Sequence, residues 1–199
     1  MAPFNNPRLV ITGHAADGRS IFRTDELVEA FSPFGPSKSS FSTFDTRDAV
    51  PVSNNNTNSP DGAAVPAPKI PRCPPSGSLF CVTNLPPRYS VPMHRTQSLD
   101  YCVVMSGEIV LALDGGEEKT VKAGEFIIQG GANHQWINRT DEPCRIAFVM
   151  VGADKVQLGD GTVLEETVFT GPKSQDPLEA ECWLGLIGKV SKQRYRMRG

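Results

Sequence analysis

The chain has 199 residues, enough for one domain with a hydrophobic core, and its 39% hydrophobic and 21% charged residues are ordinary for a soluble protein. Its formal net charge of −2, from 20 Lys and Arg against 22 Asp and Glu, lacks the basic excess that nucleic-acid binding requires. Five widely spaced cysteines, the lack of a signal-peptide pattern and the lack of an apolar run of about 20 residues favour a cytoplasmic protein that does not contact membranes.

The first predicted element is an N-terminal β arm, residues 1–52. Residues 8–26 have the pattern of two short strands around the turn Ala-Asp-Gly-Arg, and residues 37–53 carry a weaker strand pattern. Residues 53–75 are rich in Asn, Pro, Ala and Ser. We expect them to form an exposed loop, because they have too little apolar surface to offset the entropy lost on ordering.

Residues 76–170 are predicted to form one antiparallel β-barrel or sandwich. Short runs rich in β-branched and aromatic residues follow one another there, separated by turn sequences such as Ser-Gly-Glu and Asp-Gly-Gly. The chain has no internal repeat of the length typical of solenoids or propellers, which favours a single barrel. The last segment, residues 171–199, has a helical period over residues 177–190, so we predict a short C-terminal helix followed by a basic tail.

Two of the three histidines, His94 and His134, fall within this predicted barrel, and Asp100 follows His94 by six residues. Imidazole is the commonest side-chain metal ligand, and two histidines with one carboxylate form a recurring open metal site. The same residue types can also lie in a barrel interior for structural reasons. We assign the remaining histidine, His14, and the neighbouring Arg95 structural or surface roles.

The spacing around these residues resembles the two motifs of the cupin superfamily. Residues 92–107, PMHRTQSLDYCVVMSG, resemble the first motif, H-X-H-(X)3,4-E-(X)6-G, with His94, Thr96, Asp100 and Gly107 at its four positions. Residues 124–138, GEFIIQGGANHQWIN, resemble the second motif, G-(X)5-P-X-G-(X)2-H-(X)3-N. In the second motif one residue is missing before the middle glycine, and glutamine replaces the proline. The positions of the second motif are taken by Gly124, Gln129, Gly131, His134 and Asn138.

The resemblance implies an all-β fold: a cupin-type antiparallel β-barrel, also called a jelly roll or double-stranded β-helix. Residues 94–118 and 133–152, with the sequence VITGH in the arm, are similar to small cupins encoded in fungal secondary-metabolite (polyketide) gene clusters. In such proteins an N-terminal arm packs on the barrel or on a partner subunit. The resemblance therefore implies a homodimer that exchanges N-terminal strands.

This sequence departs from the metal-binding cupin pattern at two positions. Thr96 replaces a histidine and is a poor metal ligand, and Asp100 is one methylene shorter than the usual glutamate. His94, Asp100 and His134 could still hold one divalent metal, Zn, Fe or Mn. The alternative is a metal-free site, in which the two histidines act as general acid and base and Asp100 orients them.

Three further side chains are candidate substrate-binding residues: Gln129, Trp136 and Thr96. Trp136 shares a strand face with His134, so it either stacks on an aromatic substrate or packs in the core. From the resemblance we expect a tailoring enzyme that acts on a small polyketide-derived aromatic or carboxylated metabolite. A non-redox lyase step, decarboxylation or dehydration, is the favoured reaction, and of the two we place decarboxylation first. The alternatives are a metal-dependent dioxygenase of the cupin type and a cupin that binds a small ligand without catalysis.

Overall fold

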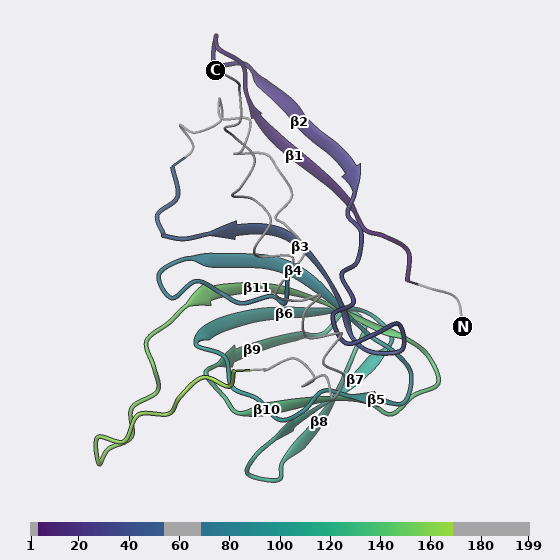
Figure 1. The fold of residues 1–199 in the computed structure, drawn as a ribbon, viewed down its shortest axis with the longest axis vertical. Coiled ribbons are helices and arrows are strands. Elements are labelled where there is room, and N and C mark those ends of the chain that lie inside the picture. Colours follow the sequence, from purple (N-terminus) through teal and green to yellow (C-terminus); the bar gives the residue numbers. More distant parts are fainter. Residues whose placement is uncertain (1–3, 54–68, 169–199) are drawn as a thin grey trace, which may run out of the picture. The chain divides into compact units, whose positions relative to one another are not determined.

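The computed structural model describes residues 4–53 and 69–168, and these residues form β-strands and loops without a helix (Figure 1). The all-β class is confirmed. No helix within the described residues is long and apolar enough to cross a membrane. The helix predicted for residues 171–199, and most of the loop predicted for residues 53–75, lie outside the described residues.

The strands in chain order are β1 (Arg8–His14), β2 (Ser20–Leu27), β3 (Ser40–Arg47), β4 (Ser78–Leu85), β5 (Tyr89–Ser90), β6 (Ser98–Ser106), β7 (Glu108–Leu113), β8 (Glu118–Lys122), β9 (Phe126–Gly130), β10 (His134–Asn138) and β11 (Cys144–Gly152).

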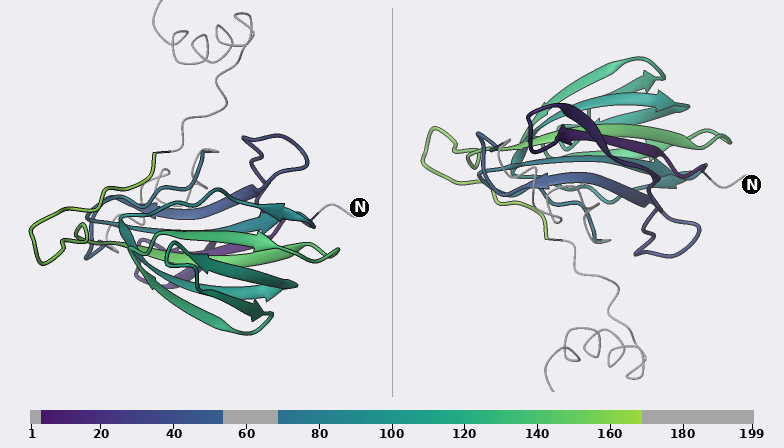
Figure 2. Two further views of the ribbon diagram at one scale, coloured as in Figure 1. Left: turned by 90° about the horizontal axis from the view of Figure 1, so that it is seen from below. Right: turned by 90° about the horizontal axis from the view of Figure 1, so that it is seen from above.

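Two antiparallel sheets enclose the main core. The five-stranded sheet has the order β3-β4-β11-β6-β9, and the four-stranded sheet has the order β5-β10-β7-β8, with the strands labelled in Figure 1. Figure 2 shows the same strands from two further sides. Both sheets contribute side chains to one apolar cluster, which places the core between them. Buried members of this cluster come from β4, β6 and β11 of the first sheet and from β7 and β10 of the second; they include Leu79, Cys81, Cys102, Val104, Ile109, Trp136, Ile146 and Phe148.

Strand alternation decides which polar side chains enter this core. On β6 every second residue from Ser98 to Val104 is buried, because successive side chains of a strand point to opposite faces. Asp100 therefore shares the inward face with the apolar Cys102 and Val104. The same two-residue period buries Gln129 on β9 and His134 and Trp136 on β10. The hydrophobic pattern that drives sheet packing thus also carries the polar site residues inward.

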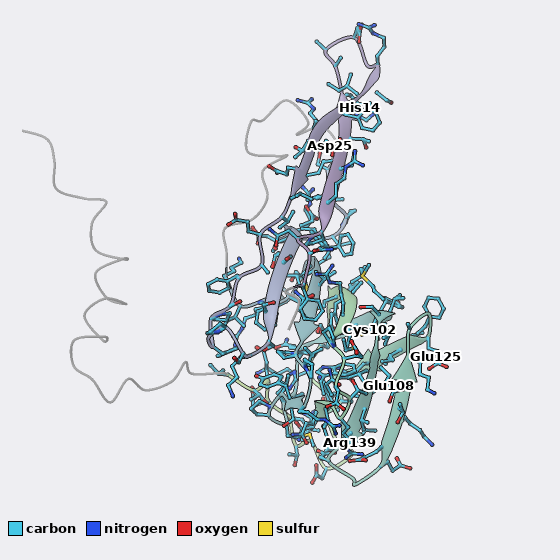
Figure 3. All side chains as sticks on the ribbon, turned by 90° about the vertical axis from the view of Figure 1, so that its right-hand side faces the viewer. His14, Asp25, Cys102, Glu108, Glu125 and Arg139 are labelled. Carbon is cyan, nitrogen blue, oxygen red and sulfur yellow. The ribbon has the colours of Figure 1, made fainter. Side chains whose placement is uncertain are left out.

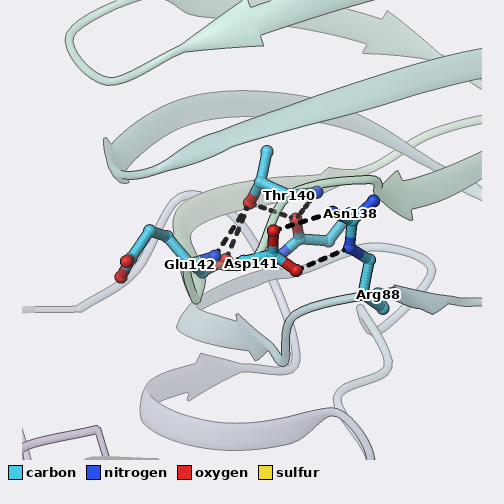
Figure 4. Close-up of polar contacts among 5 residues, drawn as sticks. All are labelled: Arg88, Asn138, Thr140, Asp141 and Glu142. Atoms are coloured by element: carbon cyan, nitrogen blue, oxygen red, sulfur yellow. Dashed lines mark hydrogen bonds and ion pairs between the residues drawn. The ribbon is translucent and has the colours of Figure 1, made fainter.

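The turn between β10 and β11 is built around the buried Asn138 (Figure 4). Its side-chain amide donates to the carbonyl oxygens of Leu85, at 3.2 Å, and Glu142, at 2.8 Å. Its side-chain oxygen accepts from the backbone N–H of Thr140, at 3.0 Å, and from the Thr140 hydroxyl, at 2.8 Å. The asparagine of the second motif therefore holds the end of β10 in place, and with it the strand that begins at His134.

Gly107, the last position of the first motif, is required by the tight connection from β6 to β7. Its φ is 74°, a left-handed conformation that residues with a Cβ adopt rarely. A Cβ added there would lie 2.6 Å from the carbonyl oxygen of Pro143. Both the backbone conformation and the space therefore favour glycine at this position.

Strands β1 and β2 form the hairpin predicted for residues 8–26, a two-stranded sheet of its own. Residues at its base contact the outer face of the five-stranded sheet. Leu9 packs against a cluster that contains Phe44 and Val82. The Arg145 guanidinium of β11 donates to the carbonyl oxygen of Asn5 at 2.7 Å. The start of the arm is thus anchored on the barrel of its own chain.

Candidate functional site

His94 and His134 lie side by side, although 40 positions separate them in the sequence. Their backbones form an antiparallel bridge, in which each N–H donates to the other residue's carbonyl oxygen at 2.8 Å. Their ring centroids are 4.2 Å apart. The structure therefore brings together the two histidines that the motif spacing singled out.

Asp100 and Gln129 face the same interior from the opposite sheet. They are directly paired across β6 and β9, and the Gln129 amide nitrogen lies 3.2 Å from His134 Nε2. Asp100 is 2% exposed, Gln129 4% and His134 2%, whereas His94 is half-buried. The candidate site is therefore an interior cluster of polar side chains built from both sheets.

The hydrogen bonds of the two rings define which nitrogen carries the proton. His94 Nδ1 lies 2.9 Å from the carbonyl oxygen of Pro92, and His134 Nδ1 lies 3.0 Å from that of Ala132. A carbonyl oxygen can only accept, so each Nδ1 is the protonated nitrogen. In the neutral rings Nε2 then holds the lone pair, and in His134 this lone pair accepts from the Gln129 amide.

Burial keeps both rings uncharged near neutral pH. Burial, with the neighbouring His94 ring and the Arg95 charge acting in the same direction, lowers the pKa of His134 to about 4. Burial also lowers the pKa of His94, against the effect of its hydrogen bond to Pro92. The pKa of Asp100 is shifted the other way: burial raises it, although hydrogen bonds from Ser98 and Thr96 oppose the shift. The site thus pairs neutral imidazoles with a buried carboxyl group whose pKa lies above its ordinary value.

The two hydroxyls next to Asp100 orient its carboxyl group. Ser98 Oγ donates to Oδ1 at 2.5 Å, and Thr96 Oγ1 lies 3.4 Å from Oδ2. Thr96, which replaces the usual histidine, therefore contacts the acid of its own motif. Ser98 was not predicted, although its position two residues before Asp100 on the same strand face was a usable signal.

Two of the bulkier neighbours have structural roles here. Trp136 packs edge-on between the His134 and Phe148 rings and belongs to the apolar core. Its ring centroid lies 5.4 Å from that of His134 and 5.9 Å from that of Phe148. Stacking of Trp136 on a substrate stays a prediction. The Arg95 guanidinium donates to the carbonyl oxygen of Gly131, and its backbone N–H donates to Thr167 Oγ1 at 3.0 Å. These bonds tie the two motif segments to the chain that follows β11.

The cysteines near the site are unreactive core residues. Burial and the nearby Asp100 raise the thiol pKa of Cys73 to about 11 and that of Cys81 to about 12. The pKa of Cys102 is raised by the same causes. The thiolate is the nucleophilic form, so these groups do not act as nucleophiles at neutral pH.

Comparisons with known proteins agree with this architecture. The family described as "Cupin domain" matches residues 81–152, which include both motif histidines. A relative from Diaporthe leptostromiformis, named "Phomopsin biosynthesis cluster protein D", is 31% identical over 182 residues, which are 86% of this chain and 91% of that protein. The chain is a cupin.

Other similar proteins of this cupin carry more varied names. The "Cupin-domain-containing oxidoreductase fogC" of Aspergillus ruber is 30% identical over 149 residues, which are 73% of this chain and 72% of that protein. Among solved structures, the polyketide cyclase RemF of Streptomyces resistomycificus has a TM-score of 0.43 and 19% identity, with 78% of this chain and 87% of that chain covered. The predicted resemblance to cupins of fungal biosynthetic clusters is confirmed.

As arranged here, the side chains of this cupin do not fit a bound metal. Within residues 4–53 and 69–168, no three His, Cys, Asp or Glu side chains are placed as metal ligands. The Nε2 lone pair of His134 is already used by Gln129, and both oxygens of Asp100 face hydroxyl donors. Metal binding by His94, Asp100 and His134 would require these hydrogen bonds to rearrange, and it stays a prediction.

Because the pKa of His134 is low, we expect the free energy of unfolding of this cupin to depend on pH. Below about pH 6.5 the unfolded chain protonates this histidine, whereas the folded protein does not until about pH 4. The unfolded state therefore binds more protons in this window, and the free energy of unfolding is expected to fall by about 3 kcal/mol as the pH drops through it. Urea unfolding at a series of pH values, with a chelator present, measures this.

The His134→Asn variant is the matched control for the pH series, because asparagine can still donate to Ala132 but has no group that titrates in this range. The variant should lose most of the pH dependence between pH 6.5 and 4, while the contributions of His94 and Asp100 remain. Equal pH slopes for the wild type and the variant would show that His134 protonates normally in the folded state.

Proposed function

We propose that this cupin is an enzyme that tailors a small secondary metabolite by a non-redox elimination, with dehydration as the reaction that its site supports best. The observation that carries the proposal is the pairing of neutral histidines with a buried carboxyl group of raised pKa inside one barrel. A base and an acid whose environments shift their pKa values in opposite directions can divide proton abstraction and proton donation between them. Relatives named for biosynthetic clusters support the metabolic setting.

In the proposed mechanism His94 is the base. Its Nδ1 donates to Pro92, so Nε2 holds the lone pair that removes a proton from a substrate carbon. Asp100 in its protonated form donates to the departing hydroxyl group. A carbon–carbon double bond forms as the carbon–oxygen bond breaks, and water leaves. His134 stays neutral because its pKa is about 4, so the proton is held at His94.

The experiment that tests the function uses the compound that accumulates when the gene is deleted from its host. The purified protein should convert this compound to a product lighter by one water, in the absence of oxygen and of added cofactors. Mass spectrometry of the reaction distinguishes this result from the loss of carbon dioxide, which would indicate the decarboxylation alternative. An unchanged compound that binds the protein would instead support a non-catalytic binding cupin.

A redox reaction is the second candidate, because one relative that covers most of this chain is named an oxidoreductase. Oxidation needs an oxidant, and a cupin oxygenase needs a metal to activate oxygen. The same incubation repeated in air with ferrous iron separates the two candidates. A product that gains oxygen, formed only in air and with iron, would overturn the elimination proposal and support a rearranged metal site at His94, Asp100 and His134.

We also propose that the partner of this chain is a second copy, joined through the outer face of the five-stranded sheet. Phe126 and Ile128 on β9 are 76% and 71% exposed, and Tyr101 on β6 pairs directly with Ile128. The start of the arm already lies on the neighbouring part of this face. The arm strands carry further exposed apolar side chains, including Phe22 and Leu27. A two-stranded hairpin is only marginally stable by itself. An arm packed on the partner's sheet would bury the exposed apolar side chains of both the arm and the sheet.

The dimer makes a direct prediction. The wild-type protein should have the mass of a dimer in light scattering, and Phe126→Lys with Ile128→Lys should give a monomer, because two charges cannot be buried unpaired in an apolar interface. Leu158→Lys is the matched control, since Leu158 is also an exposed apolar residue but lies after β11, outside this face. A monomeric wild-type protein, or a dimer that survives both lysines, would contradict the proposed interface.

A further inference from the structure

The side-chain carbonyl of Gln129 is a buried acceptor that the protein leaves unused. Gln129 is 4% exposed, and its Oε1 has no hydrogen-bond partner among the described residues. Buried polar groups in folded proteins are nearly always paired, because an unpaired one loses its bonds to water without replacement. This orphaned oxygen therefore calls for a partner that the described chain does not contain.

The orientation of this amide follows from the histidine beside it. His134 Nδ1 donates to the Ala132 carbonyl, so the neutral ring offers only a lone pair at Nε2. A lone pair needs a donor, so the NH2 group of Gln129, 3.2 Å away, must face the ring. The amide cannot turn over to pair its oxygen without placing two acceptors together. The oxygen is thus directed away from His134 by a chain of hydrogen bonds that begins at the backbone.

The charges around Gln129 restrict what its oxygen can accept from. Asp100 is its direct neighbour across β6 and β9 and enters the proposed reaction protonated, so the acceptor that this wall of the barrel presents is Gln129 Oε1. An anionic carboxylate or phosphate has no hydrogen to donate to this oxygen, so it would leave the oxygen unpaired and be repelled by it. A cationic ammonium would meet the positive charge of Arg95, which already disfavours a proton on His134. A neutral hydroxyl group donates one hydrogen bond and meets neither penalty.

We propose that Gln129 Oε1 accepts a hydrogen bond from a neutral hydroxyl group of the substrate, so that the site selects an alcohol or phenol over a carboxylate at this position. This inference rests on the proposed function, because it takes the bound molecule to be the substrate of the proposed enzyme, and it adds the chemical class of that substrate. It favours dehydration of a hydroxylated compound over decarboxylation, because a carboxylate is the group that this wall disfavours. Gln129 is then the residue that fixes the position of the substrate relative to His94 and Asp100.

The test compares three small probes that differ at one group: phenol, anisole and benzoate. Phenol can donate a hydrogen bond, anisole has a methyl group in place of that hydrogen, and benzoate is an anion. Binding is measured by ligand-observed NMR titration on the full-length protein. We expect phenol to bind the wild type about tenfold more tightly than anisole, the value of one hydrogen bond to a buried acceptor. Benzoate should bind more weakly than phenol.

The variant that tests the assignment is Gln129→Met, which keeps the length of the side chain and removes the acceptor. The ratio of phenol to anisole affinity should fall to about one in this variant, whereas Gln157→Met, at an exposed glutamine, should leave the ratio unchanged. Because the ratio is taken within each variant, a general loss of affinity does not affect it. Thermal melting and circular dichroism check that each variant is folded.

Several results would overturn the assignment: a wild type that binds anisole as well as phenol, a wild type that prefers benzoate or binds no phenol, or a ratio that persists in Gln129→Met. These probes bind without reacting, so this outcome is independent of turnover. If the accumulated precursor is not converted but the phenol ratio behaves as expected, the proposed reaction fails and the hydroxyl site stands. If the precursor is converted but the ratio is near one, the reaction stands and the Gln129 assignment fails.

Discussion

Replacing His94 with asparagine is expected to lower the turnover of the accumulated precursor by about 10²- to 10⁴-fold, the usual contribution of a positioned general base. The asparagine amide nitrogen can take the place of Nδ1 and keep the hydrogen bond to the Pro92 carbonyl. It has no second nitrogen to hold a lone pair, so the proton acceptor alone is removed. The rate constant kcat of the purified variant, measured by mass spectrometry, checks this.

His14→Asn is the matched control, because it makes the same chemical change on the β1–β2 hairpin (Figure 3). Its turnover should equal that of the wild type. Added imidazole should restore part of the activity of His94→Asn, since a diffusible base can replace a missing one but cannot repair a misfolded barrel. Wild-type turnover in His94→Asn would show that His94 is not the base. A rate loss without imidazole rescue would assign His94 a structural role.

Replacing Gly77 with alanine is expected to destabilise the fold by about 3 kcal/mol, at the upper end for overpacking a well-packed position. The added Cβ would lie 1.7 Å from the backbone carbonyl oxygen of Arg47, on the strand beside β4. Backbone atoms on a paired strand cannot move aside as a flexible side chain can. The free energy of unfolding, from guanidinium titration, measures the effect.

Gly115→Ala provides the comparison for this substitution. Gly115 lies in the turn between β7 and β8, and no described atom lies within 4 Å of a Cβ added there. The free energy of unfolding should change by no more than about 0.5 kcal/mol, as for most surface substitutions. If the two alanine variants are equally stable, the close approach of β3 to the start of β4 is not a constraint in solution.

The motif spacing indicated the fold more sharply than the composition did. The spacing of His94, Asp100 and His134 indicated a cupin barrel. In the structure Asp100 and His134 are buried at inward strand positions, and the half-buried His94 is bridged to His134. The roles of the three residues stay predictions. Trp136 shows the limit of the same reasoning. Strand alternation predicted that Trp136 lies on the same face as His134. Only the tertiary structure shows that Trp136 packs against Phe148 and belongs to the apolar core.

What the sequence by itself determined is the class of fold and the residues that can enter the site, because strand alternation and turn glycines are local properties of the chain. Only the tertiary structure decided how those residues are used. The opposite sheet supplies the amide that takes the His134 lone pair, and burial sets the pKa values of the two histidines and the acid. Hydrogen-bond partners and desolvation depend on atoms far apart in sequence, so the partners and pKa values of these side chains are set by the packing of the two sheets.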